Sequence, residues 1–138
     1  MAIAAQDRTD LELAHAFAQA YRDVDSEALR SLLSPIVRVR VLAPPGFKEI
    51  KGSEEMISEL CDSFANWSVD EVDAIEVELL SANRMQTGRM AQITQRFRLR
   101  QADGDQPATM LVTHLVAIAD RRIALVDELC SGLMPDTH

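Results

Sequence analysis

Two long apolar runs near the carboxyl end, residues 108–119 and 123–130, constrain the fold of this chain more than any other feature. Only a short polar turn at residues 120–122 separates them. Runs of this length joined by a tight turn are typical of two antiparallel strands. The sequence therefore predicts a C-terminal hairpin, and any polar side chain inside its runs must find a partner or serve a purpose.

Apolar and polar residues alternate with a period of two through the rest of the second half. Residues 72–79 alternate with acidic side chains, and residues 91–100 alternate with polar and basic ones. A turn rich in structure breakers, residues 102–108, leads into the hairpin. An earlier alternating run at residues 36–43 predicts one more strand, and residues 47–52 predict a short edge strand. The pattern indicates four long strands in a meander, preceded by an early strand.

Apolar residues at helical spacing predict two helices before the first strand. Thr9 opens a capping-box pattern, T-x-x-E, ahead of an amphipathic helix over residues 10–22. Asp25 or Ser26 caps a second, shorter helix. Pro35 ends that helix, because proline cannot continue it.

A third helix begins at Ser53, which we expect to cap it. Its apolar stripe consists of Met56, Ile57, Leu60, Cys61 and Phe64. The order of elements predicts an α+β fold, with an antiparallel sheet and the helices packed on one face. At 138 residues and 47% hydrophobic, the chain is one domain, residues 1–138, with a core over about residues 8–132.

Composition excludes several function classes. A net charge of -8 argues against nucleic acid as a partner, because phosphate binders need a basic surface. No apolar run is long enough to span a membrane, and the opening residues lack a signal-peptide pattern, so we expect a cytoplasmic protein. Cys61 and Cys130 lie in apolar settings and are expected to be buried, reduced thiols. No ligand spacing predicts a metal, and no phosphate or dinucleotide motif predicts a cofactor.

Three segments carry a resemblance to a known family: residues 16–41, 51–60 and 114–130. They read AFAQAYRDVDSEALRSLLSPIVRVRV, KGSEEMISEL and HLVAIADRRIALVDELC. The chain resembles the NTF2-like superfamily, in its SnoaL-like and ketosteroid-isomerase-like branches, over nearly its whole length. The resemblance implies a cone-shaped, cystatin-like roll of three helices on a curved antiparallel sheet. It also implies a pocket at the open end and a homodimer formed through the outer face of the sheet.

The residues that steroid isomerases of this group use are absent. The resemblance places Phe17 at the position of their helix tyrosine and Val41 at the position of their aspartate base. Phenylalanine has no hydroxyl to donate, and valine cannot accept a proton. We therefore do not expect steroid isomerisation by that mechanism.

His114 is the first candidate for chemistry. It shares an alternating face with Val112, Val116 and Ile118, the bulkier face of its strand and the one suited to the interior. A neutral imidazole there can act as a general base or donate to a ligand carbonyl. The alternative is a core histidine satisfied by a backbone carbonyl or a neighbouring carboxylate.

Glu128 is the second candidate. It shares a strand face with Ala124, Val126 and Cys130, whereas Asp127 lies on the other face with Ile123, Leu125 and Leu129. Comparison with relatives favours Glu128 as the pocket acid, and strand adjacency can bring it near His114 as an acid/base unit. The alternative is a solvated acid near a strand end.

Six further residues are expected to contact the ligand: Phe17, Tyr21, Val41, Trp67, Val116 and Val126. Packing alone is the alternative for Tyr21 and for Trp67, the only tryptophan. Basic side chains on polar strand faces indicate an external charge ladder, with an anion site as the alternative. These are Arg38, Arg40, Arg96, Arg98 and Arg100.

Together these features predict a pocket for a small, largely apolar molecule. As an enzyme, the domain would be a cofactor-independent isomerase or cyclase in which His114 moves the proton, Glu128 orients it and Tyr21 assists at the ligand. Two alternatives stay open. One is a small-molecule binding module without catalysis, and the other is a dimeric interaction protein whose own side chains fill the pocket.

Overall fold

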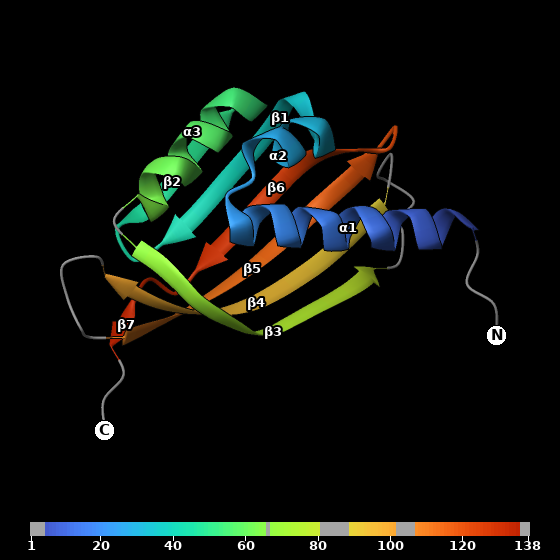
Figure 1. Ribbon diagram of the computed structural model, residues 1–138. Coiled ribbons are helices and arrows are strands. Elements are labelled where there is room, and N and C mark those ends of the chain that lie inside the picture. Colours follow the sequence, from blue (N-terminus) through green and yellow to red (C-terminus); the bar gives the residue numbers. More distant parts are fainter. Residues whose placement is uncertain (1–4, 66, 81–88, 102–106, 136–138) are drawn as a thin grey trace.

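The computed structural model describes residues 5–65, 67–80, 89–101 and 107–135 (Figure 1). Three helices lie on one face of a curved sheet (Figure 1). The helices are α1 (Ala5–Asp23), α2 (Ser26–Leu32) and α3 (Ser53–Phe64). The strands are β1 (Leu33–Ala43), β2 (Gly46–Lys51), β3 (Trp67–Leu80), β4 (Arg89–Gln101), β5 (Pro107–Ala119), β6 (Arg122–Cys130) and β7 (Met134–Pro135). This is the α+β architecture that the sequence predicts.

The strands follow the order β2-β1-β6-β5-β4-β3, with the two-residue β7 paired to β5. The predicted meander of four long strands is confirmed, since β3, β4, β5 and β6 are joined by antiparallel pairings. The short strand β2 lies at the sheet edge, also as predicted. One pairing departs from the expected antiparallel sheet, because β1 runs parallel to β6. Because β1 and β6 are far apart in the sequence, no turn between them indicates whether they run parallel or antiparallel.

Alternation along β5 fixes which side of the sheet is interior. Val112, His114 and Val116 have no exposed surface, whereas Leu111 on the opposite face is exposed. Side chains from β1, β4 and β6 fill the same interior against Phe17 of α1. The helices cover this face, since α1 contacts β3 and β4 while α3 contacts β1 and β2. The functional candidates on β5 and β6 therefore point into the layer between sheet and helices.

Two predicted helix caps are wrong, although α3 does begin at Ser53 as predicted. Helix α1 begins at Ala5, so Thr9 lies inside the helix and does not cap it. Helix α3 is capped by Gly52 rather than Ser53, which is its buried first residue. Gly52 has φ +91, a left-handed conformation that favours glycine, and its N–H donates to the carbonyl of Val37 at 2.8 Å. A backbone constraint at the strand–helix junction thus replaces the expected side-chain cap.

Helix α2 is capped as one of the two alternatives predicts. The Asp25 side chain accepts a hydrogen bond from the N–H of Ala28 at 3.1 Å. The helix ends at Leu32, before Pro35, which already lies in β1. Pro35 occupies the irregular stretch where the pairing of β1 with β6 shifts, a place where a missing N–H is tolerated.

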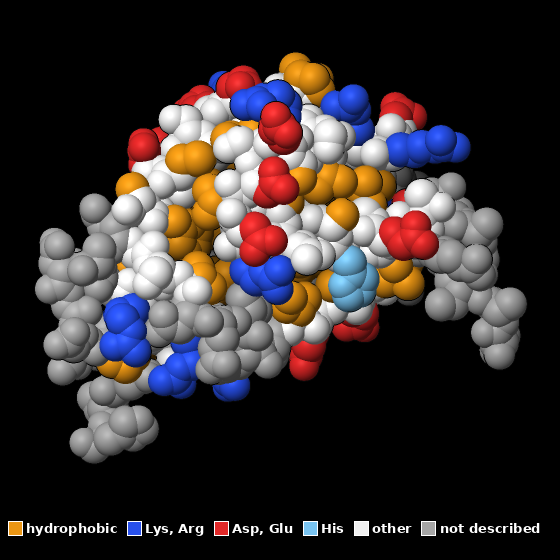
Figure 2. Space-filling view, viewed as in Figure 1, with side chains coloured by type: hydrophobic (Ala, Val, Ile, Leu, Met, Phe, Trp, Pro, Cys, Tyr) orange, Lys and Arg blue, Asp and Glu red, His pale blue; other side chains and the backbone are white. Residues whose placement is uncertain are grey.

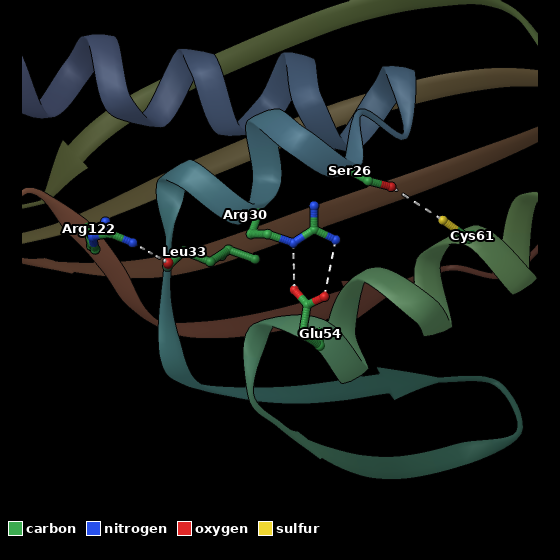
Figure 3. Close-up of polar contacts among 6 residues, drawn as sticks. All are labelled: Ser26, Arg30, Leu33, Glu54, Cys61 and Arg122. Atoms are coloured by element: carbon green, nitrogen blue, oxygen red, sulfur yellow. Dashed lines mark hydrogen bonds and ion pairs between the residues drawn. The ribbon is translucent and has the colours of Figure 1, made fainter.

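Polar contacts fasten α2 to its neighbours (Figure 3). Arg30 donates two hydrogen bonds to the Glu54 carboxylate of α3, at 2.8 and 3.1 Å. The Ser26 hydroxyl lies 3.8 Å from the Cys61 sulfur. Cys61 is exposed, so the prediction that it is buried is wrong. Its side chain lies on the side of α3 that faces α2, where it remains accessible to solvent. Both cysteines are free.

An irregularity in β6 corrects one predicted face. Ile118 pairs with Ile123, but Ala117 pairs with Leu125, so Ala124 is an extra residue in β6. The bulge turns Ile123 into the core, where it is fully buried, instead of leaving it on the face of Leu125. Beyond the bulge, the alternation that assigns Glu128 to the inner face holds.

Candidate active site

His114 and Glu128 face each other across neighbouring strands. They are register partners in the antiparallel pairing of β5 with β6. The Nε2 atom of His114 lies 2.8 Å from Oε1 of Glu128, which is hydrogen-bond distance. The pairing that strand adjacency predicts is therefore present.

The imidazole of His114 is sealed in by aromatic rings. Its ring stands edge-to-face against Tyr21 at a centroid distance of 4.5 Å and against Phe17 at 5.2 Å. The side chain has no exposed surface, and its buried Nδ1 has no hydrogen-bond partner among the described residues. The hydrogen bond at Nε2 fixes the orientation of the ring, and Nδ1 is left as a buried polar atom facing apolar neighbours.

Tyr21 is the second polar neighbour of Glu128. Burial raises the pKa of Tyr21 well above its usual range, and the nearby Glu128 charge raises it further. For Glu128, burial opposes ionisation, but the hydrogen bond and charge interaction with His114 and the contact with the Tyr21 hydroxyl outweigh it. The net result is a pKa below the usual carboxyl value. The site thus holds an ionised carboxylate beside a protonated phenol at neutral pH.

Two adjoining pockets meet at these residues. One has a volume of about 140 Å³ and the other about 210 Å³. Both are lined by Tyr21, Val41, Ser63 and Glu128. Apolar side chains are exposed in a hollow between the ends of α1 and α3 and the start of β3 (Figure 2). Glu128 has a side-chain exposure of 13% and lines both pockets, whereas His114 lies behind it and lines neither.

The residues predicted to contact ligand divide into two groups. Tyr21, Val41 and Trp67 line the larger pocket. Phe17, Val116 and Val126 line neither pocket and are fully buried. The structure therefore corrects their expected position: they lie in the packed interior, where Phe17 supports the His114 ring. Alternation of apolar and polar residues predicts which side chains lie on the inner face of a strand. It does not predict which of those side chains line a pocket and which are packed in the core.

Several pocket residues were not predicted. Lys48 of β2 and Glu59 of α3 form an ion pair between two residues that line the smaller pocket. Phe64 belongs to the predicted stripe of α3, but its place in the larger pocket was not foreseen. The sequence around Lys48 and Glu59 does not indicate that they pair, because their ion pair depends on how α3 packs against β2.

The predicted external charge ladder contains a specific ion pair. Arg40 donates two hydrogen bonds of 2.6 Å to the Asp127 carboxylate on the exposed side of the sheet. Asp127 therefore lines neither of the two pockets above and has a partner of its own. Among the described residues, no three His, Cys, Asp or Glu side chains gather as a metal ion would require. None of the helices in the described ranges is long and apolar enough to cross a membrane.

Sequence comparison finds no relative: no family model matches the chain, and no curated protein is significantly similar to it. Solved structures do resemble it. A protein from Bacillus subtilis proposed to be an isomerase has a TM-score of 0.72 at 13% identity, covering 90% of this chain and 87% of that one. A proposed polyketide cyclase from Xanthomonas campestris has a TM-score of 0.69 at 16% identity, covering 88% and 90%.

A third structure is a protein of ketosteroid-isomerase-like fold from Catenulispora acidiphila, in complex with trimethylamine. Its TM-score is 0.62 at 17% identity, covering 88% of this chain and 86% of that one. At such identities the likeness is one of fold. This chain is an α+β domain with the NTF2-like fold of the ketosteroid-isomerase-like proteins and polyketide cyclases. The predicted fold resemblance is thereby confirmed.

Proposed function

We propose that this domain binds a small, largely apolar molecule where the two pockets meet and moves a proton on it, without a cofactor, as an isomerase or cyclase. The observation that carries the proposal is the Glu128 carboxylate, which lines both pockets while its Oε1 is held by His114. A buried carboxylate with fixed partners in an apolar pocket is a common acid/base arrangement. The NTF2-like fold of proposed isomerases and cyclases is consistent with this chemistry.

In this proposal Glu128 accepts the proton, and His114 is a positioning residue. The roles are the reverse of those expected from the sequence, because Glu128 lines the pockets and the His114 ring lies behind it. Val41, the position where the family resemblance places a steroid isomerase's base, is the register partner of Glu128 on the adjacent strand. Glu128 on β6 therefore places a carboxylate next to the position on β1 where a steroid isomerase has its base.

Tyr21 is proposed as the hydrogen-bond donor to the substrate. It lies one helical turn after Phe17, so the hydroxyl missing at residue 17 is provided four residues later on the same side of α1. Because its pKa is raised, the phenol remains protonated, and in the proposed complex its hydroxyl turns from Glu128 to donate to a substrate oxygen that gains negative charge. This pair of groups suits removal of a proton from a carbon next to a carbonyl.

The rival function is a binding or interaction module without catalysis. The pocket volumes favour it, since about 140 and 210 Å³ lie below the roughly 300–1,000 Å³ of common ligand sites. A polycyclic substrate therefore requires side chains to move. A compound of a few carbons fits without rearrangement, and it is the more suitable substrate for the acid/base proposal.

The test begins with a thermal-shift screen of small ketones, acids, amines and terpenoids against wild type and Glu128→Gln. A ligand present at about a hundred times its dissociation constant adds roughly 2.7 kcal/mol to the stability of the folded state. Compounds that bind are then incubated with enzyme in deuterium oxide, and mass spectrometry measures deuterium incorporation at carbon. Exchange that depends on Glu128 supports proton abstraction. Binding without exchange supports the rival module.

We also propose a homodimer formed through the outer face of the sheet. Phe47 of β2, Leu42 of β1 and Leu129 of β6 form a continuous cross-strand row, because Leu42 is the register partner of both others. Their exposed fractions are 62%, 50% and 54%. Contiguous exposed apolar side chains are a common feature of protein interfaces. A second copy of this chain is the proposed occupant of this row.

For localisation, we propose the cytoplasm. Both cysteines are free, and their partly or fully accessible positions suit a reducing compartment. Fractionation of cells that express the tagged chain tests this placement directly.

A further inference from the structure

The larger pocket combines aromatic rings with a carboxylate. Tyr21, Phe64 and Trp67 contribute rings to its wall, and Glu128 contributes the carboxylate. The rings of Tyr21 and Phe64 are perpendicular, at 89°, with centroids 6.1 Å apart. Aromatic faces and a carboxylate both attract positive charge, and aromatic cages of this kind recognise substituted ammonium groups.

Two basic side chains on the neighbouring strands β1 and β2 already have acidic partners. Lys48 is ion-paired with Glu59, and Arg40 is held by Asp127 on the outer face. None of the described residues that line the larger pocket is lysine or arginine. His114 lies behind Glu128 and does not line this pocket, so the carboxylate faces the pocket without a basic side chain among the described residues that line it.

We infer that the larger pocket binds a small organic ammonium ion, seated among Tyr21, Phe64 and Trp67 with its charge towards Glu128. The inference rests on the proposed function, since it names the ligand class of the same pocket. A volume of about 210 Å³ holds an alkylammonium group but not a polycyclic molecule. Such an ion has an apolar outer surface, which suits the remaining wall, formed largely by aliphatic side chains such as Leu99 and Met110.

Choline and its uncharged carbon isostere dimethylbutanol, in which a tert-butyl group replaces trimethylammonium, isolate the contribution of charge. Trp67 is the only tryptophan of the chain and lines the pocket, so its fluorescence reports occupancy directly. Titrations at matched ionic strength are expected to show choline binding about tenfold more tightly than dimethylbutanol. Calorimetry provides a second readout.

Three variants test which side chains cause the preference for choline over dimethylbutanol. Glu128→Gln is expected to lower the affinity for choline while leaving the affinity for dimethylbutanol unchanged, so that the ratio of the two affinities falls and only the part contributed by the rings remains. Glu128→Asp keeps the charge and retains a preference for choline, which guards against a folding artefact. Phe64→Leu keeps apolar volume but removes a ring, so choline loses more affinity than dimethylbutanol does.

Equal affinities for the two probes, or the same ratio in Glu128→Gln as in wild type, would overturn the ammonium inference. Neither result affects the proposed proton transfer, which deuterium exchange measures separately. Failure of both probes to bind also overturns the inference. If exchange on other compounds then remains dependent on Glu128, the proposed function stands with a neutral substrate.

Discussion

Gln95 of β4 donates a hydrogen bond of 2.9 Å from its amide nitrogen to the backbone carbonyl of Ala18 in α1. The side chain is fully buried, and its amide oxygen has no hydrogen-bond partner among the described residues. This contact fixes the helix that carries Phe17 and Tyr21 against β4, the strand that pairs with the strand of His114. It therefore links the position of the aromatic rings to the position of the imidazole.

Two substitutions at Gln95 are expected to distinguish the stability gained from its hydrogen bond to Ala18 from the cost of burying its polar amide. The change Gln95→Glu puts a charge in the core and removes the donor, so we expect a loss of about 3 kcal/mol or more. The change Gln95→Leu removes both the bond and the unsatisfied oxygen, and we expect a change within about 1 kcal/mol. Urea unfolding measures both free energies. If Gln95→Leu is as unstable as Gln95→Glu, the hydrogen bond itself carries the stability and this view is contradicted.

The Glu128 carboxylate is expected to contribute pH-dependent stability. Its pKa in the folded state lies below the ordinary value of 4.5, so the folded state holds the ionised form more strongly than the unfolded chain does. The contribution is complete above the ordinary value and is lost as the pH falls through the lower folded-state pKa. Unfolding free energies across acidic pH should therefore show a smaller acid-dependent loss in Glu128→Gln than in wild type. Glu76→Gln, at an exposed position of β3, is the matched control and should follow wild type.

The exposed row Phe47, Leu42 and Leu129 predicts a substitution-sensitive dimer. Phe47→Glu and Leu129→Glu each place a carboxylate in the proposed interface, where it loses hydration without a partner. Sedimentation velocity should show a wild-type dimer and monomeric variants. Ile36→Glu is the control, because Ile36 is exposed and apolar but lies outside the row. A wild-type monomer at all concentrations would exclude this interface.

The two thiols should react at different rates. Cys61 is exposed, whereas burial raises the pKa of Cys130 despite the opposing hydrogen bond from the Gly132 N–H. A raised pKa lowers the thiolate fraction, and thiolate is the reacting form. With a chromogenic disulfide reagent at mildly alkaline pH we expect one fast and one slow phase. Cys61→Ser should remove the fast phase, and loss of the slow phase instead would contradict the assignment.

Local patterns were sufficient for much of this fold. The period of two in β5 places His114 on the inner face, and the stripe of α3 identifies Met56, Ile57 and Leu60 as core. Each of these signals depends only on neighbours within one element. The pairing of His114 with Glu128 follows nearly as directly, since a tight turn fixes the register of a hairpin.

The depth of the site could not be predicted in the same way. Phe17 and Val126 lie on inner faces like Tyr21 and Val41, but only the latter two reach a pocket. The difference arises where α1 and α3 stop covering the sheet, which depends on packing between distant segments. The same reason explains why the sequence assigned the proton to His114 rather than to Glu128.

The parallel pairing of β1 with β6 affects when the site can form during synthesis. Arg40 and Asp127, joined across these strands, are 87 positions apart in the chain. Contacts of this range are slow to form, because closing so long a loop costs conformational entropy. On the ribosome, β1 can pair with the edge strand β2 but not with β6 until β6 has left the exit tunnel. Glu128 and the wall beside Val41 therefore cannot come together before β6 has been synthesised.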